Sequence, residues 1–105
     1  MKEITAQQLH EKITNKEDFQ LIDVREDYEH EAANLGGEAI PMGQVFDQHE
    51  RIDRNKTVVV YCRSGNRSGV VINELEKRFG FTNLYNLKGG IMTYAREVDS
   101  SLNVV

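Results

Sequence analysis

The sequence predicts a small α/β domain with a mostly parallel sheet of four to five strands and helices on both faces. Segments of strand length alternate with segments of helical spacing along all 105 residues, and this alternation favours parallel strands joined by helices. The strand candidates are nearly continuous apolar runs, as expected in a sheet that is covered on both sides. The length suits one domain, so we expect residues 1–105 to form a single unit.

A helix cap and an apolar run define the first elements. Thr5 and Gln8 have the spacing of a capping box, so a helix should begin there and continue to about Ile13. Residues 19–24 (Phe-Gln-Leu-Ile-Asp-Val) form the first candidate for a buried strand. A charged helix over residues 25–33 should follow this strand.

The middle of the chain predicts shorter elements. The helix over residues 25–33 should turn Tyr28 and Ala32 toward the core and leave its acidic side chains in solvent. Residues 39–42 form a short extended piece whose proline cannot donate to a ladder, so it belongs at the edge of the sheet or at the start of a loop. Helical spacing of apolar side chains resumes over residues 45–55.

The second half contains the strand that we expect at the centre of the sheet, residues 57–61 (Thr-Val-Val-Val-Tyr). A helix with an apolar face follows and should end at Phe79, because Gly80 stands where a left-handed cap is expected. Residues 83–87 predict the last strand and residues 91–98 the last helix.

Composition and charge exclude several classes of function. The net charge is −4, divided between −7 over residues 1–55 and +3 over residues 56–105. An acidic total argues against nucleic acid as the main partner. No apolar run approaches the roughly 18 residues of a membrane span, and the first residues lack a secretory pattern. With one cysteine, a disulfide framework is excluded, and we expect a reducing, cytoplasmic location.

The single cysteine, Cys62, directly follows the central strand. Sites in open α/β sheets form at the carboxyl ends of the strands. Gly65 and Asn66 tolerate positive φ and allow a tight loop whose amides turn inward, while Arg63 and Arg67 add positive charge. These groups should lower the thiol pKa below the roughly 8.5 of a free cysteine and create a pocket for a small anion. On spacing alone, a buried inert cysteine with solvated arginines fits as well.

Other polar residues have structural explanations. Asp23 and Arg25 stand at the end of a strand, where a carboxylate could be catalytic, but a pair that braces neighbouring loops is favoured. Gly89 and Gly90 predict a turn that lets two loops approach closely. The three histidines fall in predicted helices and are expected at the surface. No spacing of cysteine and histidine indicates a metal site, and no cofactor is expected.

Three segments carry a family resemblance. The segment Cys62-Arg63-Ser64-Gly65-Asn66-Arg67-Ser68 resembles the active-site loop of single-domain rhodanese sulfurtransferases. The segment Leu21-Ile22-Asp23-Val24-Arg25-Glu26 resembles the family's first signature strand. The segment Leu87-Lys88-Gly89-Gly90-Ile91 resembles its last turn, and the three segments occur in the family's order. Two positions depart from the family pattern: Asn34-Leu35 replaces a common His-Ile pair, and Tyr94 stands near the place of a common tryptophan.

The resemblance implies a cycle in which the Cys62 thiolate takes the outer sulfur of a donor anion such as thiosulfate and forms a persulfide. The amides of residues 63–67 would surround that sulfur, and cyanide or a thiol would remove it. Since the chain has no second cysteine, the acceptor must come from outside, as a small molecule or as another protein's thiol.

Two other functions remain open at this stage. The first is a cysteine phosphatase. Such enzymes place five residues between cysteine and arginine, whereas four separate Cys62 from Arg67, so the loop is smaller and suits one sulfur atom better than a tetrahedral phosphate. A non-catalytic rhodanese-like interaction module is the second alternative, although such modules commonly lack the cysteine. A sulfur carrier with a protein donor or acceptor would use the same persulfide on Cys62, so the sequence does not distinguish it from a thiosulfate sulfurtransferase.

Overall fold

The computed structural model describes residues 1–105 and contains a five-stranded, fully parallel sheet. Its spatial order is β1 (Glu3–Ile4), β5 (Leu84–Leu87), β4 (Val58–Tyr61), β2 (Gln20–Asp23) and β3 (Glu38–Ala39). The predicted α/β class is therefore confirmed, with residues 58–61 at the centre. The two-residue strand β1 was not predicted, because so short a segment carries no periodicity.

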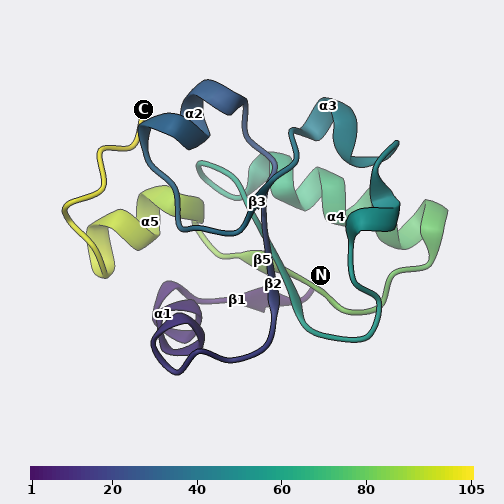
Figure 1. The fold of residues 1–105 in the computed structure, drawn as a ribbon, viewed down its shortest axis with the longest axis horizontal. Coiled ribbons are helices and arrows are strands. Elements are labelled where there is room, and N and C mark those ends of the chain that lie inside the picture. Colours follow the sequence, from purple (N-terminus) through teal and green to yellow (C-terminus); the bar gives the residue numbers. More distant parts are fainter.

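Helices cover both faces of the sheet (Figure 1). The helices α1 and α5 lie together on one side, while α3 and α4 lie on the other. Their bounds, with the remaining short helices, are α1 (Ala6–Thr14), α2 (Asp27–Ala32), α3 (Met42–Val45), the 3-10 helix η1 (His49–Arg51), α4 (Asn66–Phe79) and α5 (Gly90–Glu97).

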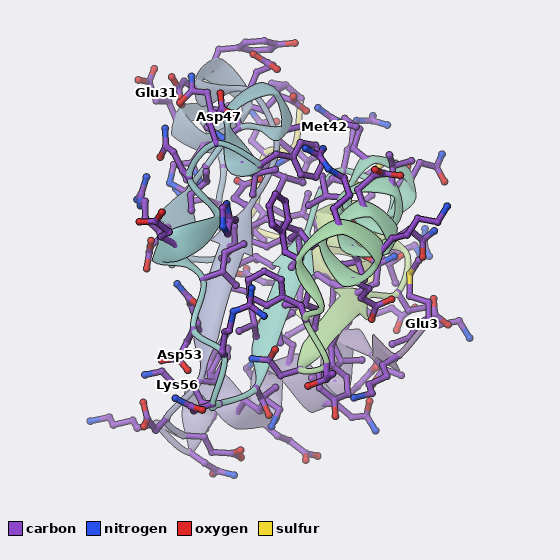
Figure 2. All side chains as sticks on the ribbon, turned by 90° about the vertical axis from the view of Figure 1, so that its right-hand side faces the viewer. Glu3, Glu31, Met42, Asp47, Asp53 and Lys56 are labelled. Carbon is purple, nitrogen blue, oxygen red and sulfur yellow. The ribbon has the colours of Figure 1, made fainter.

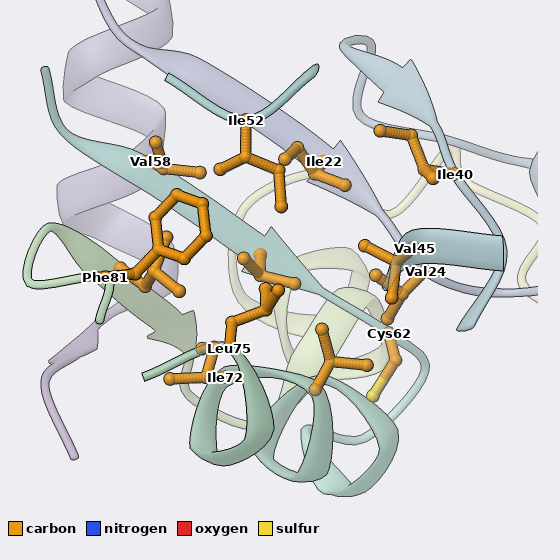
Figure 3. Packing of buried hydrophobic residues seen from close by; sticks show 13 residues of the cluster. Ile22, Val24, Ile40, Val45, Ile52, Val58, Cys62, Ile72, Leu75 and Phe81 are labelled. Atoms are coloured by element: carbon orange, nitrogen blue, oxygen red, sulfur yellow. The ribbon is translucent and has the colours of Figure 1, made fainter. Parts of the chain in front are cut away.

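The alternation of side chains along β4 divides the core into two clusters. Val58 and Val60 face the cluster under α3 and α4, and Cys62 continues the same face beyond the strand (Figure 3). Val59 and Tyr61 face the opposite cluster under α1 and α5. All five residues are at most 1% exposed, which explains why this strand has no charged side chain.

Two of the predicted helix signals are confirmed. Thr5 and Gln8 form the capping box of α1, with the Thr5 hydroxyl accepting from the Gln8 amide at 3.1 Å. Gly80 ends α4 with a φ of 72°, in the left-handed region. The continuous helix predicted over residues 45–55 is wrong, because the chain forms α3 and then the separate turn η1.

The predicted inward face of the helix over residues 25–33 is also wrong. Tyr28 is 67% exposed and Ala32 is exposed, whereas Glu29 and Ala33 are buried. The helix begins at Asp27, and the face that it turns to the protein carries Glu29 and Ala33 instead. The buried position of Glu29 is stabilised by a cation from α4, described below.

The outer surface is polar. Figure 2 shows charged side chains such as Glu3, Glu31 and Asp47 pointing away from the ribbon. None of the helices combines the length and the apolar character needed to cross a membrane.

Candidate functional site

The Cys62 thiol lies where β4 ends, inside a short loop that leads into α4. Its sulfur points toward the first turn of that helix (Figure 3). The backbone amides of Gly65 and Ser68 donate to Sγ at 3.1 and 3.4 Å, and the Ser68 hydroxyl lies 3.3 Å away. Gly65 has a φ of 100°, so the expected need for glycine in this loop is confirmed. Asn66 is already the first residue of α4.

This arrangement changes the acidity of the thiol. Burial raises the pKa of Cys62, but hydrogen bonds from the Ser68 hydroxyl and from the amides of Ser68, Gly65 and Ser64 act in the opposite direction. Their combined effect exceeds that of burial, so the pKa is lowered from its ordinary value. The thiolate is therefore favoured by the Ser68 hydroxyl and by backbone amides at a helix N-terminus.

The carbonyls of the same loop face the other way. The amides of Ile91 and Met92, in the first turn of α5, donate to the carbonyls of Cys62 and Arg63 at 2.9 and 3.1 Å. A side chain at Gly90, where φ is 65°, would overlap both of those carbonyls. The predicted close approach of two loops at Gly89-Gly90 is therefore present, and it holds the cysteine loop in place.

Neither loop arginine touches the sulfur. Arg67 forms a two-pronged ion pair with Glu29 of α2, at 2.7 and 2.9 Å. Hydrogen bonding from Arg67 lowers the pKa of Glu29 to about 2 despite its burial, so the pair is charged at neutral pH. The exposed Arg63 instead donates to the carbonyl of Val105 at 3.0 Å. Each guanidinium group therefore donates to an acceptor other than the sulfur.

The structure also has no open pocket above the thiol. Cys62 is 1% exposed, and the loop amides close directly on its sulfur. The three surface hollows are lined by other segments. The small-anion pocket expected from the sequence therefore stays a prediction. In this structure the sulfur is enclosed, and the Arg67–Glu29 pair bridges α4 and α2.

Asp23 and Arg25 form a fully buried ion pair at 2.7 Å, at the carboxyl end of β2. Arg25 also donates to the carbonyl of Ala33 at 2.7 Å, which ties the strand to the end of α2. This geometry supports the bracing role. His30, which was expected at the surface, is half-buried, and its Nδ1 lies 2.8 Å from Asp23.

Comparison with known proteins identifies the family. The model of the rhodanese-like domain matches residues 5–97. This chain belongs to the rhodanese-like domain family. The sulfurtransferase of Allochromatium vinosum is 33% identical, with 90% of this chain and 88% of that protein covered. YtwF of Bacillus subtilis, which is named provisionally as a sulfurtransferase, is 40% identical, with 92% and 93% covered.

Solved structures agree with this assignment. The crystal structure of a rhodanese-like domain protein from Staphylococcus aureus matches with a TM-score of 0.83 and 28% identity, covering 100% of this chain and 99% of that one. Some relatives are longer: the chain spans 36% of the rhodanese-like/PpiC domain-containing protein 12 of Arabidopsis thaliana chloroplasts, at 36% identity.

The two departures from the rhodanese pattern are accommodated by packing. Leu35 donates its amide to the hydroxyl of Tyr61 at 3.1 Å, which anchors the turn after α2. Tyr94 is 5% exposed in the cluster under α1 and α5, and its hydroxyl lies 3.2 Å from Nδ1 of His10. Neither residue contacts the cysteine loop of this rhodanese-like domain.

Two residues of the site were missed by sequence reasoning. Glu29 was assigned to a solvated acidic face, since its partner is 38 positions away and no local pattern indicates it. Asn86 hydrogen-bonds to the Ser68 hydroxyl at 2.6 Å and to the Gly65 carbonyl at 3.1 Å. Its signal was available, because it is the one polar amide within the buried strand Leu84–Leu87.

Proposed function

We propose that this rhodanese-like domain is a sulfurtransferase that carries a sulfane sulfur as a persulfide on Cys62. The observation that carries the proposal is the sulfur's position at the start of α4, where it accepts two backbone amides. Amides held in this way stabilise a thiolate without protonating it. The family membership and the sulfurtransferase name of a relative covered over most of its length support the same reaction class.

The reaction has two displacement steps. The Cys62 thiolate attacks the outer sulfur of a donor such as thiosulfate, forming an Sγ–S bond while sulfite leaves with the electron pair of the broken S–S bond. An acceptor, cyanide or a thiolate, then attacks the outer sulfur, and the electrons of the Sγ–S bond return to Cys62. Both steps begin or end with a thiolate at Sγ, which is the form that the loop amides favour.

The acceptor comes from outside the chain. Cys62 is the only cysteine in the sequence, so the persulfide has no partner within this chain with which to form a disulfide. The acceptor is therefore a small thiophile or a cysteine of another protein.

The test is an intact-mass measurement after incubation with thiosulfate. We expect a gain of one sulfur atom that cyanide removes with release of thiocyanate. Cys62→Ser is the matched control, because it keeps the size and polarity of the side chain but supplies a hydroxyl that is not a nucleophile at neutral pH. A missing adduct on the folded wild-type protein with thiosulfate and with a persulfide donor would overturn the proposal, as would an equal adduct on Cys62→Ser.

A further inference from the structure

Four residues around the thiol form a closed ring of hydrogen bonds. The Gly65 amide donates to Cys62 Sγ, while the Gly65 carbonyl accepts from Asn86 Nδ2. Asn86 Oδ1 accepts from the Ser68 hydroxyl, and Ser68 Oγ lies 3.3 Å from Sγ. Because a carbonyl only accepts, the Gly65 contact fixes the orientation of the Asn86 amide, with Oδ1 toward Ser68.

Ser68 has a single hydroxyl hydrogen and two neighbours that could accept it. Its 2.6 Å contact with Asn86 Oδ1 shows where that hydrogen lies, since neither atom of this pair has another proton to offer. A protonated Cys62 can then donate its S–H to Ser68 Oγ. Each of the four residues then donates one hydrogen bond to the next, in the order Cys62, Ser68, Asn86, Gly65 and back to Cys62. A thiolate in the same ring would instead face an oxygen lone pair at 3.3 Å.

The ring is buried, so this conflict cannot be relieved by water. Cys62 and Ser68 are at most 1% exposed, and Asn86 is 6% exposed. Rotation of the Ser68 hydroxyl relieves it: the hydrogen leaves Asn86 Oδ1 and points at the thiolate. That rotation leaves Oδ1 without a donor, so Asn86 and the thiolate compete for one hydrogen.

Charged groups surround the ring without joining it. Arg67 acts on Cys62 through space and is paired with Glu29 of α2, while Asp23 and Arg25 neutralise each other at the end of β2. On the neighbouring strand β1, Glu3 is the register partner of Asn86 and is exposed. The hydroxyl of Ser68 is therefore the one side-chain donor within reach of Sγ.

We propose that Asn86 is a positioning residue that governs the reactivity of Cys62 by holding and releasing the Ser68 hydroxyl hydrogen. Asn86 holds the hydrogen while Cys62 is a thiol and yields it when Sγ becomes a thiolate. In the persulfide the negative charge moves to the outer sulfur, so the hydrogen returns to Asn86. This last step rests on the proposed sulfurtransferase function, whereas the competition in the free enzyme does not.

The test is the thiol pKa, measured as the pH dependence of alkylation by iodoacetamide with no sulfur donor present. Ser68→Ala removes the donor and should raise the pKa by about one unit. Asn86→Leu removes the competing acceptor at similar size and should lower the pKa by about one unit. The Gly65 carbonyl keeps its bond from the Gly69 amide in that variant, so the loop retains a backbone anchor.

The double variant separates positioning from a structural effect. In the Ser68→Ala background, Asn86→Leu should leave the pKa unchanged, because there is no hydroxyl to release. Asn83→Leu is the matched control: this asparagine anchors the far end of β5 to the carbonyls of Asp53 and Lys56, so its loss should lower stability but leave the thiol pKa unchanged.

A pKa that stays the same or rises in Asn86→Leu overturns the proposal, and so does a shift that persists in the Ser68→Ala background. If Asn86→Leu does not fold, Asn86→Ala removes the same acceptor without bulk and must give the same sign. The pKa shifts of these variants and the sulfur adduct are independent measurements. If the pKa shifts are as expected but no adduct forms, the sulfurtransferase function alone is rejected. If the adduct forms but the pKa shifts are absent, the role of Asn86 alone is rejected.

Discussion

Replacing Asp23 by asparagine should destabilise the protein strongly without removing any group that touches the sulfur. The two carboxylate oxygens accept four hydrogen bonds from Arg25, one from its amide and three from its guanidinium. Both side chains are fully buried, so Asp23→Asn leaves an uncompensated cation in the interior. Removing one partner of such a pair costs about 3–5 kcal/mol.

Urea-induced unfolding measures this loss. With a slope of about 2 kcal/mol per molar urea, the midpoint should fall by about 2 M. The double variant Asp23→Asn/Arg25→Met removes the orphaned cation and should recover most of the loss. A loss below about 1 kcal/mol, or a double variant no more stable than the single one, would refute the bracing role. Loss of sulfur transfer in a fully folded Asp23→Asn protein would instead indicate catalysis.

Three further predictions concern the loop and its neighbours. Glu29→Gln should weaken the ion pair with Arg67 and lower the free energy of unfolding by about 1–3 kcal/mol. The freed guanidinium should bind the donor anion and decrease the KM for thiosulfate, measured by steady-state thiocyanate formation. An unchanged KM would mean that the guanidinium does not bind the donor. Gly90→Ala should destabilise the fold by more than about 1 kcal/mol and slow sulfur loading, because its Cβ overlaps the carbonyls of the cysteine loop. The control Gly43→Ala, which has open space around it, should leave thermal unfolding nearly unchanged. Similar effects of the two substitutions would contradict this reason. Since the pKa of Cys62 is lowered, its alkylation by iodoacetamide should rise with pH and reach half its maximum at a lower pH than that of an unstructured cysteine peptide measured alongside; a midpoint at or above that of the peptide would show that burial outweighs the hydrogen bonds.

The elements that carry a local signal were predictable from the sequence. The central strand, the capping box at Thr5 and the glycine at position 80 each depend on a few consecutive residues and on well-known backbone preferences. Gly65 was also predictable as a position of positive φ, and Gly90 as a position where two segments approach closely. The parallel sheet was predictable from the alternation of strands and helices, but the order of the strands was not predicted.

Interactions between distant side chains were not predictable in the same way. Arg67 was expected to add positive charge to the cysteine loop, but its pairing with a glutamate 38 positions earlier has no local signal. The apolar residues over 45–55 have helical spacing, but α3 ends at Val45 and the separate turn η1 spans His49–Arg51. Helical spacing of buried side chains therefore does not require one continuous helix. Tyr28 is exposed because α2 turns Glu29 toward the protein, where it pairs with Arg67 of a distant helix.

The contacts between the cysteine loop and α5 have a consequence for how this domain could be tuned. The loop sorts its peptide groups, with amides toward the sulfur and the carbonyls of Cys62 and Arg63 toward the backbone of residues 91 and 92. The peptide groups next to the sulfur are thus held partly from behind, by the first turn of α5. A substitution that displaces this turn would therefore tilt those peptide groups and change the reactivity of a thiol that it does not touch.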